Sequence, residues 1–190
     1  MKLLAIGGSP RRDGNSNSLM RLAIEGAVER GASADVLSAR DLDVAGCLAC
    51  DGCKRTPDAT CVQDDDMQRV YDAIKECDVL LLASPVYFYA LSSWLKRVID
   101  RCYALIPPEA EEGQAAPPPR VTPGKGHYLI TSQAEDAPFF GYQILSTVVY
   151  GLTWIGMESR GQLIATGLDG PHDWKQRDDL IAAARELIVV

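Results

Sequence analysis

The sequence predicts an α/β domain built on a parallel sheet with helices on both faces. Short apolar runs rich in strand-forming residues alternate with stretches of helical periodicity along the whole chain. The first and third of these runs, 2–7 and 79–83, are almost uniformly apolar, which is typical of strands covered on both faces. The 190 residues are the size of one domain, and no boundary separates a second, so we expect a single domain over residues 1–190.

The expected elements alternate in the order strand, helix, strand. Five strands are expected, over residues 2–7, 35–37, 79–83, 128–131 and 161–165. Five helices are expected, over 16–31, 65–76, 92–103, 142–155 and 174–188. The acidic run Asp64-Asp65-Asp66 at the start of the second helix suits an N-cap with favourable dipole charge.

A proline-rich loop over 107–126 interrupts this alternation. It contains Pro107-Pro108, Pro117-Pro118-Pro119 and Pro123-Gly124, so it cannot form a regular element. Three interpretations of a loop of this length remain open: a surface insertion, a lid over a ligand, or an arm that reaches another subunit.

Composition and charge narrow the function classes. Hydrophobic residues make up 47% of the chain and charged residues 24%, as in a globular protein, and the net charge is −7. An acidic surface repels polyanions, so we expect no nucleic-acid partner and no membrane partner. The first apolar run is too short for a signal-peptide core, and we expect a cytoplasmic protein.

The loop after the first strand has the composition of a phosphate site. Residues 7–18 contain glycines, serines and two arginines and lead directly into a helix, whose free N–H groups attract anions. Gly14-Asn15-Ser16 lacks the lysine of a Walker loop, and neither Gly7 nor Gly8 begins a dinucleotide fingerprint. A hydroxyl-rich loop for a terminal phosphate monoester remains, against the alternative of an ordinary turn and N-cap.

Four of the six cysteines lie close together in a cysteine-rich loop over 46–62. The spacing Cys47-x2-Cys50-x2-Cys53 followed by Cys61 resembles the bacterial ferredoxin run and suits a [4Fe–4S] cluster. Zinc, free thiols and a reversible disulfide are the alternatives. Cys77 and Cys102 are expected as small buried apolar residues.

Several motifs in this order and spacing resemble the flavodoxin-like NAD(P)H-dependent FMN reductases and their iron–sulfur flavoprotein branch. The motifs are Gly8-Ser9-Pro10-Arg11-x-x-Gly14-Asn15-Ser16, the cysteine group, Asp65-Asp66-Met67, Ser84-Pro85-Val86-Tyr87-Phe88 and Leu95-Lys96-Arg97-Val98-Ile99-Asp100-Arg101. The resemblance implies a flavodoxin-like, doubly wound parallel five-stranded sheet of order 2-1-3-4-5, with FMN at its switch point.

The resemblance also implies which residues contact FMN. The first loop would hold the phosphate through Ser9, Arg11, Asn15, Ser16 and Ser18. The loop expected after the third strand would contact the flavin ring through Pro85, Val86, Tyr87 and Phe88. Ser132 and Gln133, after the fourth strand, are expected at the third edge of the pocket.

These features predict an FMN-dependent oxidoreductase or electron-transfer flavoprotein that carries a [4Fe–4S] cluster. NAD(P)H or a ferredoxin-like redox protein is the expected partner, and a homodimer or homotetramer the expected assembly. The alternatives are a cluster-free NAD(P)H-dependent FMN or quinone reductase and a non-catalytic electron carrier or redox sensor. No catalytic side chain is assigned, because the chain has two histidines and no Gly-x-Ser-x-Gly elbow, and a flavin carries its own chemistry.

Overall fold

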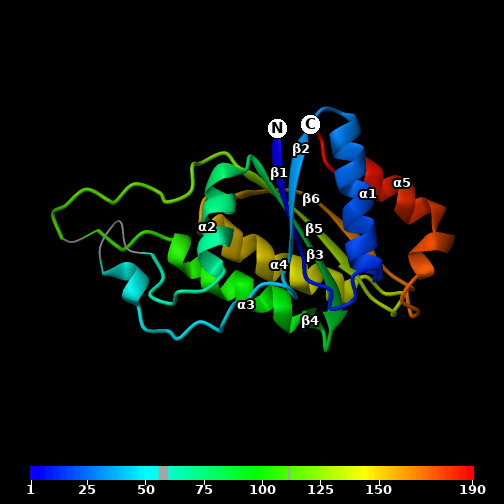
Figure 1. Cartoon of the computed structure of the whole chain (residues 1–190), viewed down its shortest axis with the longest axis horizontal. Coiled ribbons are helices and arrows are strands. Elements are labelled where there is room, and N and C mark those ends of the chain that lie inside the picture. The colour runs from blue at the N-terminus through cyan, green and yellow to red at the C-terminus, as the bar shows by residue number, and fades with distance from the viewer. Residues whose placement is uncertain (56–59, 111) are drawn as a thin grey trace.

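A twisted sheet runs through the centre of the molecule, as a computed structural model of the chain shows (Figure 1). The structure describes residues 1–55, 60–110 and 112–190, and within these ranges the sheet has six strands. Five of them are parallel, in the order β2-β1-β3-β5-β6, while β4 pairs antiparallel with the end of β3. Their bounds are Lys2–Gly7 (β1), Ser33–Ser38 (β2), Val79–Tyr87 (β3), Ala90–Leu91 (β4), Gly126–Ser132 (β5) and Glu158–Ala165 (β6).

Helices cover both faces of the sheet (Figure 1). One face carries α1 (Asn15–Glu29) and α5 (Asp178–Glu186), and the other carries α2 (Met67–Glu76), α3 (Ser93–Arg101) and α4 (Phe139–Thr153). Short 3-10 turns are formed by η1 (Gly52–Lys54), η2 (Cys102–Leu105) and η3 (Asp173–Gln176). No helix among the described residues is long and apolar enough to cross a membrane.

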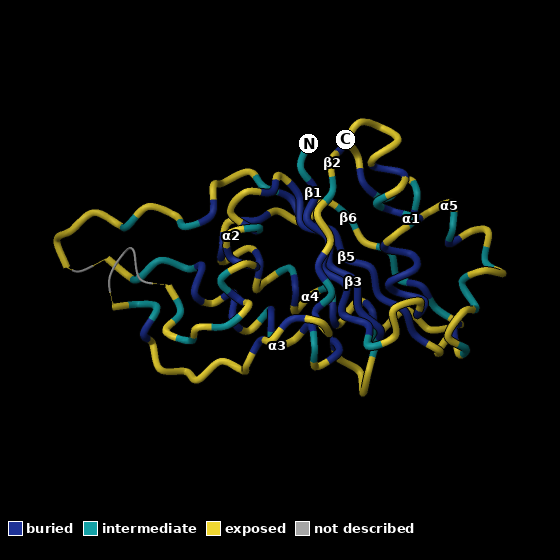
Figure 2. The backbone as a smooth tube through the Cα atoms, in the orientation of Figure 1, coloured by how far each residue is buried: buried dark blue, intermediate teal, exposed yellow. Residues whose placement is uncertain are grey.

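Alternate side chains of the central strands enter two cores. Leu4 and Leu80 pack under α2, α3 and α4, whereas Leu3 and Leu81 pack under α1 and α5. Figure 2 shows β1, β3 and β5 as buried tubes in the middle of the molecule. This confirms the inference that uniformly apolar runs form strands covered on both faces.

The predicted order 2-1-3-4-5 is confirmed for the five parallel strands, but the predicted count of five strands is wrong because it leaves out β4. The segment after residue 83 was also expected to be a loop. Instead β3 continues to Tyr87, because Ser84 and Pro85 pair with β5 and Val86 pairs with β4. The last predicted helix is divided into η3 and α5, with Arg177 between them outside helical geometry.

Candidate functional site

A cleft opens at the carboxyl edge of the sheet, where four chain segments meet. Its lining comes from the loop after β1, the end of β3 and the loops after β5 and β6. The lining residues are Ser9, Arg11, Gly14, Asn15, Ser16, Pro85, Val86, Tyr87, Ser132, Gln133, Ala134, Leu168, Asp169, Gly170 and Pro171. Ligands of open α/β sheets bind at this edge.

A buried asparagine, Asn17, holds the loop after β1 in place through hydrogen bonds to the loop backbone. The Asn17 amide accepts from the Ser9 N–H over 3.4 Å and donates to the Arg11 carbonyl over 3.1 Å. Helix α1 then begins at Asn15 with no capping side chain among the described residues, and the first three N–H groups of the helix have no intrahelical acceptor. The Ser16 hydroxyl is buried there and has no hydrogen-bond partner among the described residues. A loop with these unpaired donors at a helix N-terminus fits a phosphate group.

Asn15 joins two walls of the cleft. Its amide nitrogen donates to the Gly170 carbonyl over 2.8 Å, and its amide oxygen accepts from the Trp174 N–H over 3.3 Å. The loop after β6 is therefore held against the loop after β1 and forms a fourth wall. Sequence reasoning did not include this wall, although Gly170-Pro171 after the last strand is a turn signal at the same edge.

Gln133 lines the cleft, but its side chain makes three hydrogen bonds within the protein. It donates to the carbonyls of Glu135 (3.1 Å) and Ala137 (2.6 Å) and accepts from the Gly141 N–H over 3.1 Å. These bonds fix the loop after β5 onto α4, so the Gln133 side chain shapes the cleft wall.

A strained aromatic turn joins β3 to β4. Phe88 and Tyr89 have φ values of 46° and 63°, a region that bulky L-residues rarely adopt. The Phe88 side chain is 97% exposed, and Tyr89 packs against Phe140 with ring centroids 4.3 Å apart. Strain of this kind persists where surrounding structure enforces it and gathers at functional sites.

The cleft brings together most of the residues predicted to contact FMN. Those that line it are Ser9, Arg11, Asn15, Ser16, Pro85, Val86, Tyr87, Ser132 and Gln133. Phe88 and Ser18 are not among the lining residues. The Ser18 hydroxyl is occupied elsewhere, because it donates to the Asp13 carbonyl over 3.3 Å and accepts from Arg21 over 3.0 Å.

The cysteine-rich loop extends away from the sheet toward the proline-rich loop (Figure 1). Lys54 donates to the carbonyls of Tyr103 and Ile106, and Arg120 donates to the carbonyls of Cys53 and Ala104. These bonds hold the middle of the cysteine-rich loop on η2 and on the segment after it. Residues 56–59 of the cysteine-rich loop and residue 111 of the proline-rich loop lie outside the described residues.

Four thiols are present in this loop, but the structure does not gather them as ligands. Cys47 and Cys50 are exposed, while Cys53 and Cys61 are half-buried. Burial raises the pKa of Cys53, which also lies within electrostatic range of Cys61. No group of three His, Cys, Asp or Glu side chains that could hold a metal occurs in the described ranges.

The chemistry of the donor set nevertheless fits an iron–sulfur cluster. Four thiols are the ligands that such a cluster takes, and the Ala49 N–H already donates to the Cys47 sulfur over 3.5 Å. Ala49 and Asp51, between the cysteines, have positive φ values of 51° and 50°. The other two cysteines, Cys77 and Cys102, are buried as expected.

The doubly wound sheet and the phosphate-type cleft at its carboxyl edge define a flavodoxin-like protein. Residues 1–141 match the model of the family described as NADPH-dependent FMN reductase. The chain therefore belongs to that family.

Several known proteins are similar to this chain. An iron-sulfur flavoprotein of Methanocaldococcus jannaschii is 37% identical over 101 residues, which are 53% of this chain and 51% of that protein. The iron-sulfur flavoprotein of Methanosarcina thermophila is 36% identical over 105 residues, 55% of this chain and 54% of that protein. The chain thus spans about half the length of the curated relatives it matches.

Solved structures share the fold over nearly the whole chain. The NAD(P)H:quinone oxidoreductase from Methanothermobacter marburgensis superposes with a TM-score of 0.69 at 16% identity, covering 97% of this chain and 94% of that one. The Trp repressor binding protein from Bacillus subtilis gives a TM-score of 0.66 at 19% identity, covering 99% of both chains. At these identities the likeness establishes the fold.

Proposed function

We propose that residues 1–190 act as one FMN-dependent oxidoreductase domain that passes electrons from NAD(P)H or a redox protein to an acceptor. The observation that carries this proposal is the phosphate-type cleft in a member of the FMN reductase family, where the Ser16 hydroxyl at the start of α1 has no partner among the described residues. When bound, FMN supplies the hydride and single-electron chemistry.

The chain's own residues bind and orient the cofactor. The hydroxyls of Ser9 and Ser16, together with the first N–H groups of α1, would bind the phosphate, and Arg11 would add positive charge; the support is that all three residues line the cleft. Pro85, Val86 and Tyr87 are the proposed contacts of the flavin ring, because they line the same cleft from the end of β3.

We further propose that Cys47, Cys50, Cys53 and Cys61 hold a [4Fe–4S] cluster. Support comes from the donor set and from the relatives described as iron-sulfur flavoproteins. Protein purified without oxygen from iron-replete cells should contain about four irons per chain. Cys50→Ala should lose the iron and keep FMN, whereas Cys77→Ala, a control in a buried position, should keep both. Iron-free wild-type protein would refute the cluster and favour a plain reductase.

Turnover separates an enzyme from an electron carrier. The carrier is the second candidate, because a net charge of −7 suits docking to a basic redox protein. Purified protein should show a flavin spectrum and oxidise NADH or NADPH in the presence of a quinone or ferricyanide. A flavin spectrum without such turnover would favour the carrier, and colourless protein that binds no added FMN would exclude both.

We also propose a homo-oligomer inside the cell. Helix α4 and the residue after it expose four aromatic side chains, Phe139, Tyr142, Tyr150 and Trp154, and exposed apolar surface of this kind can mark a protein–protein contact. The free cysteines suit a reducing compartment. Trp154→Glu should lower the mass measured by sedimentation, whereas Val28→Glu, on the exposed side of α1, should leave it unchanged. A wild-type monomer would exclude the oligomer.

A further inference from the structure

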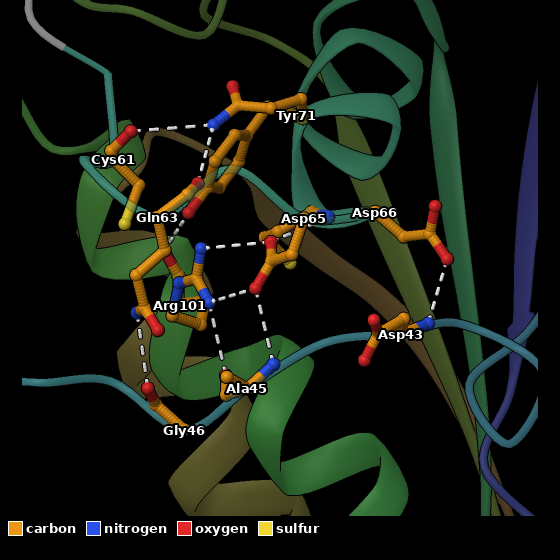
Figure 3. A network of polar contacts seen from close by, with 11 residues as sticks. Asp43, Ala45, Gly46, Cys61, Gln63, Asp65, Asp66, Tyr71 and Arg101 are labelled. Carbon is orange, nitrogen blue, oxygen red and sulfur yellow. Dashed lines mark hydrogen bonds and ion pairs between the residues drawn. The ribbon is translucent and has the colours of Figure 1, made fainter.

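An ion pair between Arg101 and Asp65 lies between the two ends of the cysteine-rich loop (Figure 3). The Arg101 side chain is 1% exposed and that of Asp65 is 10% exposed. The pairing is bidentate, with Nη1 2.7 Å from Oδ2 and Nη2 3.1 Å from Oδ1. Although burial favours the neutral carboxyl, the hydrogen bonds from Arg101 hold the pKa of Asp65 below its usual value.

Both members of the pair also bind the chain just before the first cysteine. The Ala45 carbonyl accepts from Arg101 Nη1 over 3.1 Å, and the Ala45 N–H donates to Asp65 Oδ2 over 3.2 Å. Asp65 itself follows the fourth cysteine by four residues, and its Oδ1 accepts from the Met67 N–H at the start of α2. The ion pair therefore joins the two ends of the cysteine-rich loop to each other and to α2 and α3.

Neighbouring contacts fasten the same two ends. Gln63 donates to the Gly46 carbonyl over 3.2 Å, directly before Cys47 (Figure 3). Gln68 donates to the Cys61 carbonyl over 3.4 Å. Arg101 also interacts electrostatically with Cys61. The Arg101 Nε–H is buried and has no acceptor within the part of the chain that the structure describes.

We propose that the Arg101–Asp65 ion pair is a positioning device for the cluster, which sets the separation of the two loop ends that carry Cys47 and Cys61. This inference rests on the cluster of the proposed function. Buried ion pairs can often be replaced by apolar residues at little cost in stability, so stability alone does not explain this one. Groups that hold metal ligands in place, by contrast, affect metal affinity by about 10- to 100-fold.

The test removes the pair as a unit. The double variant Asp65→Leu with Arg101→Leu leaves no unpaired buried charge. Arg101→Lys keeps the charge but cannot form both hydrogen bonds of the guanidinium fork. Arg185→Leu is the control, because it breaks ion pairs with Glu25 and Glu29 between α5 and α1, on the other face of the sheet. Each protein is purified without oxygen, and iron release to a chelator, FMN content and the urea midpoint are measured.

We expect the double variant to release iron about 10- to 100-fold faster than the wild type, with FMN content unchanged. Arg101→Lys should release iron faster than the wild type, and Arg185→Leu should match it. Release at the wild-type rate by a folded double variant would overturn the inference and leave the cluster intact. If the double variant does not fold, release at the wild-type rate by Arg101→Lys would overturn it equally. Iron-free wild-type protein would overturn the cluster and this inference together.

Discussion

Replacing Ser16 by alanine should weaken FMN binding without destabilising the FMN-free protein. The Ser16 hydroxyl is buried without a hydrogen-bond partner among the described residues. Such a group costs about 1–3 kcal/mol, so its removal should leave the free energy of unfolding of the FMN-free protein unchanged or raise it. In the complex the same hydroxyl would donate to a charged phosphate, and that bond is worth about 1.5–3 kcal/mol.

Converted to affinity, the lost bond raises the Kd for FMN about 10- to 150-fold. The assay is fluorescence titration of FMN into the cofactor-free protein, with urea unfolding of the same preparations. Ser18→Ala is the matched control, because the Ser18 hydroxyl bonds to Asp13 and Arg21 instead. It should leave the Kd unchanged and cost about 1 kcal/mol of stability. An unchanged Kd for Ser16→Ala, or a loss of stability in its cofactor-free form, would refute the reasoning.

Three further substitutions test the fold and the cleft. Burial lowers the pKa of His127 from 6.5 to about 4, so between these pH values the unfolded chain binds more protons than the folded one. The free energy of unfolding therefore decreases as the pH is lowered, by about 3 kcal/mol at pH 4. His127→Leu should remove this part of the acid sensitivity in urea titrations at pH 7 and 4.5. Gly26→Ala would place a Cβ 2.0 Å from the Arg185 carbonyl oxygen and should cost about 1–3 kcal/mol in urea unfolding, whereas Gly151→Ala, facing open space in α4, should be neutral or stabilising. Asn15→Ala removes the bonds to Gly170 in the loop after β6 and to Trp174 in η3, which should speed hydrogen exchange in this segment and weaken FMN binding. Unchanged exchange would contradict the bridging role of Asn15.

Local sequence patterns predicted the sheet because each parallel strand has its own run of apolar residues. The strand β4 was missed because two residues give no periodicity, and its pairing with β3 depends on the aromatic turn between them. Pro85 extends β3 for a similar reason, since its partner Ser132 lies 47 residues away in sequence. Pairing between distant segments cannot be derived from one short window of residues.

The candidate site shows the same division between local and distant information. Ser9 and Ser16 could be found because hydroxyls follow a strand and begin a helix. The wall formed by residues 168–171 carries no distinctive donor set, so composition gave no reason to place it at the cleft. Arg101 lies on an amphipathic helix, where a charge usually indicates a solvated face, and its partner Asp65 is 36 residues away. Only the tertiary structure reveals that this charge is buried.

Because contacts fasten the two ends of the cysteine-rich loop, the length of the segment between them can change in related sequences or designed variants. The loop between Ala45 and Asp65 is closed by contacts that belong to the helices beneath it. The entropic cost of closing a flexible loop, expressed as a free energy, grows by only about 0.6 kcal/mol for each doubling of the loop length. Insertions between the third and fourth cysteines, beyond the contacts of Cys53 and Lys54 with the rest of the domain, would therefore weaken the domain little. A segment with a different cysteine spacing could be grafted between the same two anchors, with the sheet and the cleft at its carboxyl edge left as they are.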